Sequence, residues 1–191
     1  MGIFFVMELG KGAIIGIIVV VIVVIAALGI GLWYVGTYNS LVTEDEAISQ
    51  EYAEIQNQYQ RKFDLIPQLI NVTDSYLNWE ASTLANITSL RTQWQNAVDS
   101  GDIDGQANAT EQLDAQAATI IVAVEAYPDL QSVTVVNNLM YEISGTENRI
   151  TVARGNYNEA VQDFNTHIKK WPASWVAKNN DFEEQPYYDY D

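Results

Sequence analysis

The sequence has no cysteine, one histidine and few basic residues. The absence of cysteine excludes disulfides and cysteine-ligated metal sites. The lone histidine, His167, supports neither a zinc site nor a Ser-His-Asp arrangement. Nine Lys and Arg residues stand against 25 Asp and Glu residues, which gives a net charge of −16. A chain this acidic repels nucleic acid and has no basic stripe to follow a phosphate backbone, so we expect no nucleic-acid partner.

The sequence also lacks the motifs of common enzyme sites. It has no Gly-rich phosphate loop, no P-loop and no dinucleotide fingerprint. The segment "GDIDG" at 101–105 contains possible calcium ligands, but it lacks the ligand set of an EF-hand loop and is typical of a turn. We therefore expect no catalytic residues, no metal and no cofactor, and a protein that is not an enzyme.

A long uncharged run, "AIIGIIVVVIVVIAALGIGLWYV", occupies residues 13–35. A helix of about 20 apolar residues crosses a bilayer, and Trp33 and Tyr34 stand at the end of the run, where an interfacial aromatic belt belongs. A cleaved secretory signal is the alternative, but the run exceeds the roughly 7–15 residues of such a core. The run predicts a single-pass transmembrane helix in contact with lipid, after a short leader at 1–12.

The charges on either side of this run predict its orientation. Lys11 precedes it, whereas Glu44, Asp45 and Glu46 follow. Because the positive-inside rule counts mainly Lys and Arg, the N-terminus is expected in the cytoplasm and the remaining domain outside it. Three N-x-S/T sequons agree with an exported domain and are candidates for glycosylation: Asn71, Asn86 and Asn108.

Helix signals follow the apolar run. Thr43 begins a capping-box pattern, which predicts a helix over about 44–62 after a linker at 36–43. Asp64 is a plausible N-cap for a second helix, with Pro67 in the first turn, where its missing N–H costs nothing. One continuous helix kinked at Pro67 is the alternative.

The rest of the chain is also helical in pattern. The second helix ends at "DSGDIDG", a third covers about 106–126, and Tyr127 before Pro128 marks its end. A long fourth helix ends before Pro172, and no segment shows sustained period-two alternation. The sequence predicts an all-α protein, a transmembrane helix followed by an up-and-down antiparallel four-helix bundle over 44–171.

The C-terminal tail, residues 172–191, is acidic and aromatic. Its end, "NNDFEEQPYYDYD", has no helical period. It is either a flexible end or a strap laid against the bundle.

Charged residues occur in the apolar seams of the long helices. Steps of three and four back from Ile168 give an apolar series that includes two of them, and the second helix carries two more. A buried unpaired charge is prohibitive, so each should have an opposite partner. Such a set forms either a polar pocket for a ligand or peptide, or an internal ion-pair network that fixes helix register, and we favour the network. The set is Glu80, Arg91, Glu147, Arg149 and Arg154.

Several quoted segments together resemble one family. "YNSLV", "QYQRKFDLIPQLI", "EAYPDLQ" and "TENRITVARGNYNEAVQDFN" follow one another as in the LemA family, and "WPASWVA" is similar to that family's closing segment with Trp171 in place of Phe. The resemblance covers nearly all of the chain after the apolar run. It implies a membrane-anchored α-helical bundle with its bulk outside the cytoplasm, and it implies no reaction.

Two functions fit these features. The first is a membrane-tethered adaptor or scaffold that binds another envelope protein. The second is a self-assembling, pilin-like surface subunit, found at the cell surface or in an extracellular assembly. For the second, "KGA" before the apolar run resembles an archaeal pilin-like processing signal, and small residues spaced for close helix packing would join copies of the chain. These residues are Gly12, Gly16, Ala27 and Gly31.

Overall fold

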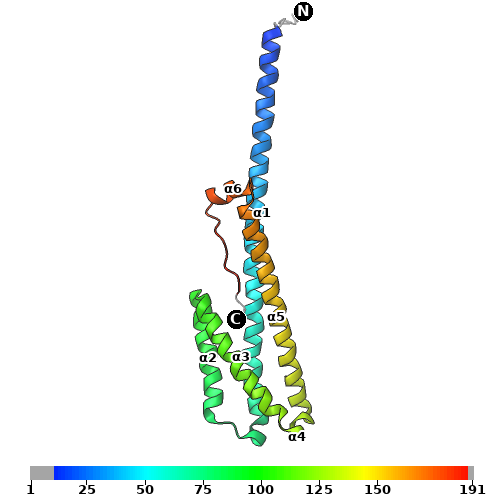
Figure 1. The fold of residues 1–191 in the computed structure, drawn as a ribbon, viewed down its shortest axis with the longest axis vertical. Coiled ribbons are helices and arrows are strands. Elements are labelled where there is room, and N and C mark those ends of the chain that lie inside the picture. Colours follow the sequence, from blue (N-terminus) through cyan, green and yellow to red (C-terminus); the bar gives the residue numbers. More distant parts are fainter. Residues whose placement is uncertain (1–10, 189–191) are drawn as a thin grey trace, which may run out of the picture. The chain divides into compact units, whose positions relative to one another are not determined.

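The computed structural model describes residues 11–188, and every element in that range is a helix. The all-α prediction is therefore confirmed. By contacts the chain divides into two units, the first containing residues 1–47 and 160–187 and the second residues 48–159 and 188–191. The helices are α1 (Lys11–Leu77), α2 (Ala81–Ser100), α3 (Ile103–Glu125), α4 (Pro128–Gln131), α5 (Thr134–Lys169) and α6 (Ala173–Asn179) (Figure 1).

Helix α1 is continuous over 67 residues. Residues 36–43, which we expected to form a linker, are helical, and the predicted boundary between 62 and 64 is absent. Pro67 lies inside the helix, as in the alternative of one continuous helix. A proline in a helix costs about 3 kcal/mol, but Ile66 and Leu69 beside it are fully buried. Each such side chain contributes about 1.5–3 kcal/mol, so their burial outweighs the lost hydrogen bond.

Two short turns join α1, α2 and α3. Helix α1 ends before Asn78, whose φ of 45° is left-handed, a conformation that Asn tolerates better than most residues. Helix α2 ends at Gly101 with φ 71°, and Asp102 then caps α3 by accepting a hydrogen bond from the Gly105 N–H at 3.0 Å. The "GDIDG" segment is thus a helix–helix turn, and its first carboxylate is used as a cap.

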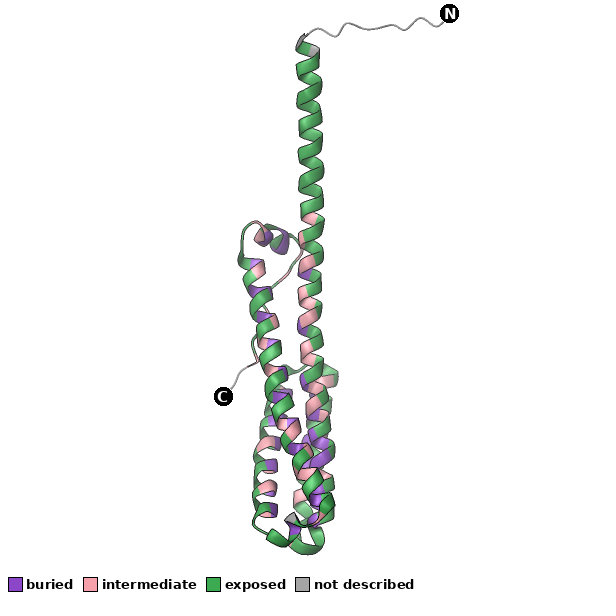
Figure 2. Ribbon diagram, turned by 90° about the vertical axis from the view of Figure 1, so that its right-hand side faces the viewer, coloured by how far each residue is buried: buried purple, intermediate pink, exposed green. Residues whose placement is uncertain are grey.

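The core of the second unit lies between α1, α2, α3 and the first part of α5. Helices α2 and α3 form a hairpin whose members lie side by side (Figure 1). Buried positions recur along one side of each helix (Figure 2), as their spacing of three and four residues requires. The rings of Phe63 and Trp94 lie 5.4 Å apart between α1 and α2. The fully or nearly fully buried residues include Ile55, Phe63, Ile66, Ile87, Leu90, Leu113, Ala117, Ile120, Ile143 and Ile150.

The first unit contains the apolar part of α1, the end of α5, helix α6 and most of the tail. Its buried side chains include Leu41, Val161, Phe164 and Val176. In contrast, every residue from 14 to 33 is exposed. This stretch is long and apolar enough to cross a membrane, the one candidate span in the described part of the chain, and it is consistent with a membrane anchor.

Candidate functional site

A fully buried lysine lies at the centre of the second unit. Lys62 of α1 has no solvent-exposed surface. Its Nζ lies 2.5 Å from Asp114 Oδ1 of α3 and also contacts the Glu147 carboxylate of α5. An unpaired ammonium in such a place would cost several kcal/mol, and two carboxylates from two other helices compensate for it. One side chain therefore connects α1, α3 and α5.

A chain of hydrogen bonds extends this cluster. Arg154 of α5 donates to the Tyr59 hydroxyl, and Tyr59 donates to Asp114 Oδ2 at 3.1 Å. The Arg154 guanidinium also lies 4.0 Å from Asp114 and 5.4 Å from the centre of the Tyr59 ring. On another side it stacks over the ring of Tyr188 in the tail, at 4.8 Å. Arg154 is thus held by an ion pair and by two aromatic faces.

Tyr59 and Arg154 keep their protonation states near neutral pH. Burial, reinforced by the charge of Asp114, raises the pKa of Tyr59 well above its usual value. Burial alone would lower the pKa of Arg154, but Tyr59, Tyr188 and Asp114 more than offset this, and the pKa of Arg154 is raised. Tyr59 therefore stays neutral and Arg154 stays charged, so neither residue is suited to proton transfer at neutral pH.

The space beside Tyr59 is too small for a substrate. The cavity beside Tyr59, bordered by Tyr52, Gln106 and Tyr188, has a volume of about 10 Å³. A single water needs about that much space or more. Glu147 and Arg154 both have partners of opposite charge, Lys62 and Asp114, as the ion-pair interpretation requires.

The other three predicted members lie outside the network. Arg91 pairs with Asp64 at 2.7 Å, and both side chains are close to half exposed. Glu80 is exposed as the N-cap residue of α2, and Arg149 is exposed and donates to Gln58 at 3.1 Å. These three are therefore not buried, and neither is Glu147, whose side chain is 42% exposed although it pairs with the buried Lys62. The turn at residues 78–80 interrupts the helix that we assumed to be continuous from 64 to 98, so Glu80 and Arg91 do not share one seam.

Sequence reasoning missed Lys62, Tyr59 as a polar group, and Asp114. The signal for Lys62 was present, because the apolar series Ile48, Ile55 and Tyr59 reaches Lys62 after one more step of three. The predicted helix ends at Lys62, so the residue is not counted among the core-facing positions of that helix. Asp114 carried no comparable signal, since it is one of 25 acidic residues.

The tail is a strap rather than a flexible end over residues 182–188, the segment between α6 and the last described residue. In the first unit the Phe182 ring lies 5.9 Å from Tyr38 and 6.1 Å from Phe164. The Asn165 amide accepts a hydrogen bond from the Gln185 N–H at 2.9 Å and donates to the Gln185 carbonyl at 2.8 Å. A side-chain amide thus pairs with an extended backbone as a neighbouring strand would.

The same pairing occurs in the second unit. Asn158 accepts from the Tyr188 N–H at 2.8 Å and donates to the Tyr188 carbonyl at 3.0 Å. The Tyr188 ring contacts Tyr157 edge to face at 6.3 Å. Tyr188, which stacks on Arg154, is therefore itself held in place by hydrogen bonds from its backbone to Asn158.

The remaining predicted residues lie as follows. The three sequon asparagines are exposed, and Asn71, Asn86 and Asn108 lie within α1, α2 and α3 respectively. His167 lies 2.9 Å from Glu44 inside the first unit. Trp33 and Tyr34 lie on α1 at the end of the exposed apolar stretch. The small residues proposed for helix packing, Gly12, Gly16, Ala27 and Gly31, all lie in α1 as well.

Comparison with known proteins gives a consistent result. Residues 51–191 match the model of the LemA family. Magnetosome protein MamQ 2 of Paramagnetospirillum magneticum is 25% identical over an alignment of 207 residues, covering 95% of this chain and 74% of that protein. Protein LemA of Metamycoplasma hominis is 28% identical over 159 residues, covering 81% of this chain and 71% of that protein. None of these names specifies a reaction.

Proposed function

The chain belongs to the LemA family, and we propose that it is a membrane-anchored, non-enzymatic adaptor or scaffold whose helical bundle lies outside the cytoplasm and binds another envelope protein. The observation that carries this proposal is the exposed apolar part of α1, where residues 14–33 are Ile, Val and other uncharged residues open to the surroundings. About 20 such residues match the hydrocarbon thickness of a bilayer. The family relationship and this stretch both support a membrane-associated helical protein.

The cluster around Lys62 supports a structural role for these charges over a catalytic one. Its charges are paired with one another, and the cavity beside Tyr59 is only about 10 Å³. The α2–α3 hairpin, in contrast, carries an open groove of about 450 Å³. Trp79 and Ile120 give this groove apolar surface, while Thr83, Asn86 and Gln116 add hydrogen-bonding groups. Such a mixed lining suits an apolar anchor with polar contacts around it, as in protein interfaces.

A photo-crosslinking experiment in intact cells tests the adaptor role. A photoreactive amino acid at Thr83 or Thr119, both at the groove, should give a crosslink to one envelope protein of defined mass. Thr151, an exposed residue of α5, is the matched control position and should not give that product. Release of the protein from membranes by alkaline carbonate would contradict the anchor. Equal crosslinking from all three positions would contradict a specific partner surface.

A second candidate function, a self-assembling subunit, has one favourable observation. A side chain added at Gly16 or Gly31 would meet no atom within 4 Å, so these positions of α1 are open to close approach by another helix. Under this alternative, native mass in mild detergent should show an oligomer that deletion of residues 13–35 abolishes. A full-length protein as monomeric as the deletion variant would reject it.

A further inference from the structure

Helix α6 and the residues before it contain two tryptophans whose large apolar rings are exposed to solvent. Trp171 is 84% exposed and Trp175 is 56% exposed, whereas Trp94 in the core of the second unit is 4% exposed. Tryptophan combines a large apolar ring with one N–H donor, and exposed tryptophans are typical of interaction surfaces. In the sequence, these tryptophans belong to the segment "WPASWVA", which contributed to the family resemblance but indicated no function.

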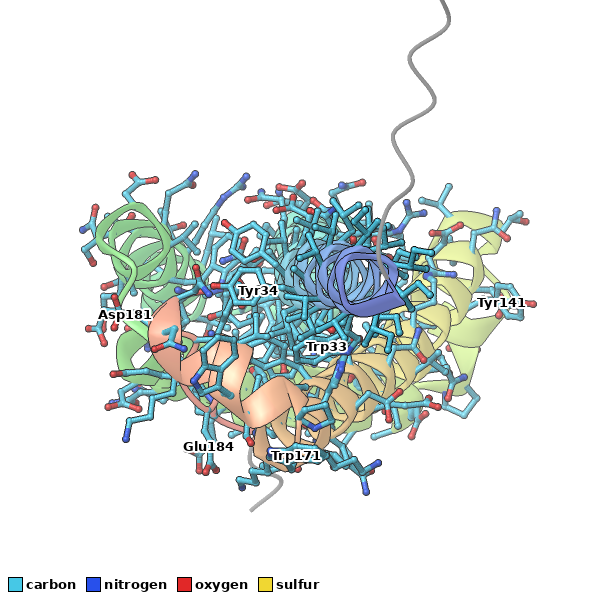
Figure 3. All side chains as sticks on the ribbon, turned by 90° about the horizontal axis from the view of Figure 1, so that it is seen from above. Trp33, Tyr34, Tyr141, Trp171, Asp181 and Glu184 are labelled. Carbon is cyan, nitrogen blue, oxygen red and sulfur yellow. The ribbon has the colours of Figure 1, made fainter. Side chains whose placement is uncertain are left out.

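Contacts within the first unit fix α6 against a defined point of α1. The Trp175 ring meets the Tyr34 ring edge to face at 5.6 Å. Asn180, the C-cap of α6, donates a hydrogen bond to the Tyr34 hydroxyl at 2.8 Å. Figure 3 views the chain from above and labels Trp33, Tyr34 and Trp171 at the α1 and α6 ribbons. Helix α6 is thus attached to α1 at the residue that follows the exposed apolar stretch.

The length of that stretch sets the depth of α6 in a bilayer. Residues 14–33 rise about 30 Å as a helix, at about 1.5 Å per residue, which equals the hydrocarbon thickness of a typical bilayer. When residues 14–33 span the hydrocarbon, Tyr34 lies in the headgroup layer. Trp175, in contact with Tyr34, then lies in the same layer.

The segment that contains these tryptophans is basic, although the chain as a whole is acidic and Asp181, Glu183 and Glu184 follow it. The segment 169–178, "KKWPASWVAK", contains three of the nine Lys and Arg residues and no acidic residue, while the whole chain has a net charge of −16. Lys170 and Lys178 are exposed, and Lys169 pairs with Glu184 at 2.7 Å while remaining exposed. Tryptophan rings with flanking lysines are the composition of segments that lie in the membrane interface.

We propose that residues 169–178, which we name the collar, form a second membrane-binding site that takes the anionic headgroups of lipids. Trp171 and Trp175 insert among the headgroups, and Lys170 and Lys178 bind lipid phosphates. The proposal rests on the membrane insertion of α1 stated above and adds a lipid class to it. A bilayer is the occupant because the collar adjoins the end of the apolar stretch and carries the opposite charge to anionic lipid.

Quenching of tryptophan fluorescence by lipid tests the position of the collar. The full-length protein is placed in vesicles of phosphatidylcholine and phosphatidylglycerol with bromine atoms near the headgroup end of the chains. Part of the emission should be quenched, and W171F/W175F should remove most of that part. W79F, which alters a half-buried tryptophan of the second unit, is the matched control and should leave the quenched part unchanged.

The outcomes separate this inference from the proposed function. If W171F/W175F is quenched as strongly as the wild type while W33F abolishes quenching, α1 is inserted and the collar is not at the bilayer, which overturns the inference alone. If brominated lipid quenches no tryptophan, the membrane insertion of α1 is wrong and both proposals fail. Far-UV circular dichroism verifies that each variant retains its helices.

The preference for anionic headgroups is tested with spin-labelled lipids. Spin-labelled phosphatidylglycerol should associate with the wild-type protein more strongly than spin-labelled phosphatidylcholine, and high salt should remove the difference. K170A/K178A should weaken the association with phosphatidylglycerol, by up to about fivefold per lysine. R61A/R149A, two exposed basic residues of the second unit, is the matched control and should retain the preference. Equal association of both lipids with the wild-type protein would overturn the proposal.

Discussion

Replacing both carboxylate partners of Lys62 should destabilise the protein by far more than the sum of the two single replacements. In D114N the Glu147 carboxylate still pairs with the buried ammonium, and in E147Q the Asp114 carboxylate does so. Only in D114N/E147Q is the fully buried ammonium left without an opposite charge. The non-additivity therefore measures the burial of Lys62 and not the strength of either ion pair.

The expected loss of stability in each variant follows from how exposed the two carboxylate side chains are. The Asp114 and Glu147 side chains are 35% and 42% exposed, so water already screens each pair. Each single replacement should cost about 1 kcal/mol, closer to a surface pair than to a buried one. The double replacement should cost about 4 kcal/mol, the range for a buried charge that loses its partner. For a chain of this size, 4 kcal/mol lowers the melting temperature by about 10 °C.

The triple variant K62M/D114N/E147Q is the decisive control. Methionine fills the space of the lysine stem without a charge, and replacing a buried ion pair by apolar residues is often neutral or stabilising. The triple variant should therefore recover most of the stability that the double variant loses. Thermal unfolding of the full-length protein in detergent, followed by far-UV circular dichroism, gives all five stabilities. A double variant equal to the sum of the singles, or a triple variant no better than the double, would refute the reasoning.

Four further predictions concern other contacts. R154A should cost about 2 kcal/mol of stability, since it removes a half-buried guanidinium from two aromatic faces and from Asp114, and unfolding in urea measures this. N165A should speed hydrogen exchange at the Gln185 amide, which N156A on the same helix should leave unchanged. Burial raises the pKa of Tyr52 from 10.0 to about 12. The contribution of Tyr52 to the free energy of unfolding is therefore complete below pH 10 and is lost as the pH rises towards 12. Y52F should reduce this loss of stability at alkaline pH, which melting curves recorded at a series of pH values measure. In a glycosylating host, an exported bundle should carry glycan at one or more of the exposed sequon asparagines Asn71, Asn86 and Asn108, and intact mass equal to the bare polypeptide would contradict this.

Helical periodicity in the sequence predicted the all-α class and the long helices, but it missed the short helices α4 and α6 and misplaced the break between α1 and α2. The seam of α5 was correct because one helix covers all of Thr134–Lys169 without a change of phase. The seam through Glu80 and Arg91 failed because Asn78 takes a left-handed conformation and starts a new phase. Pro67 had the opposite effect, since it suggested a helix start in a place where burial keeps α1 continuous. Local signals of this kind are weak against tertiary packing.

The candidate sites were predictable only where they follow a helical period. Lys62 occupies a position at which the period requires an apolar residue, and this is visible in the sequence once α1 is drawn through it. Asn165 and Gln185 are 20 residues apart, and their pairing joins a side chain to a backbone group. No period encodes such a contact. The collar was likewise hidden, because its meaning depends on the attachment of α6 at Tyr34.

The strap has a consequence for the biosynthesis of the protein. A chain emerges from the ribosome N-terminus first, and its earlier segments fold while later ones are still being made. Phe182, Gln185 and Tyr188 therefore emerge after α5, the helix that holds them. Until they do, Asn165 lacks its hydrogen bonds to Gln185, and Phe164 lacks the ring of Phe182. Closure of the strap is therefore a late step of folding, in which a segment without helical structure docks onto a helix that precedes it in the chain.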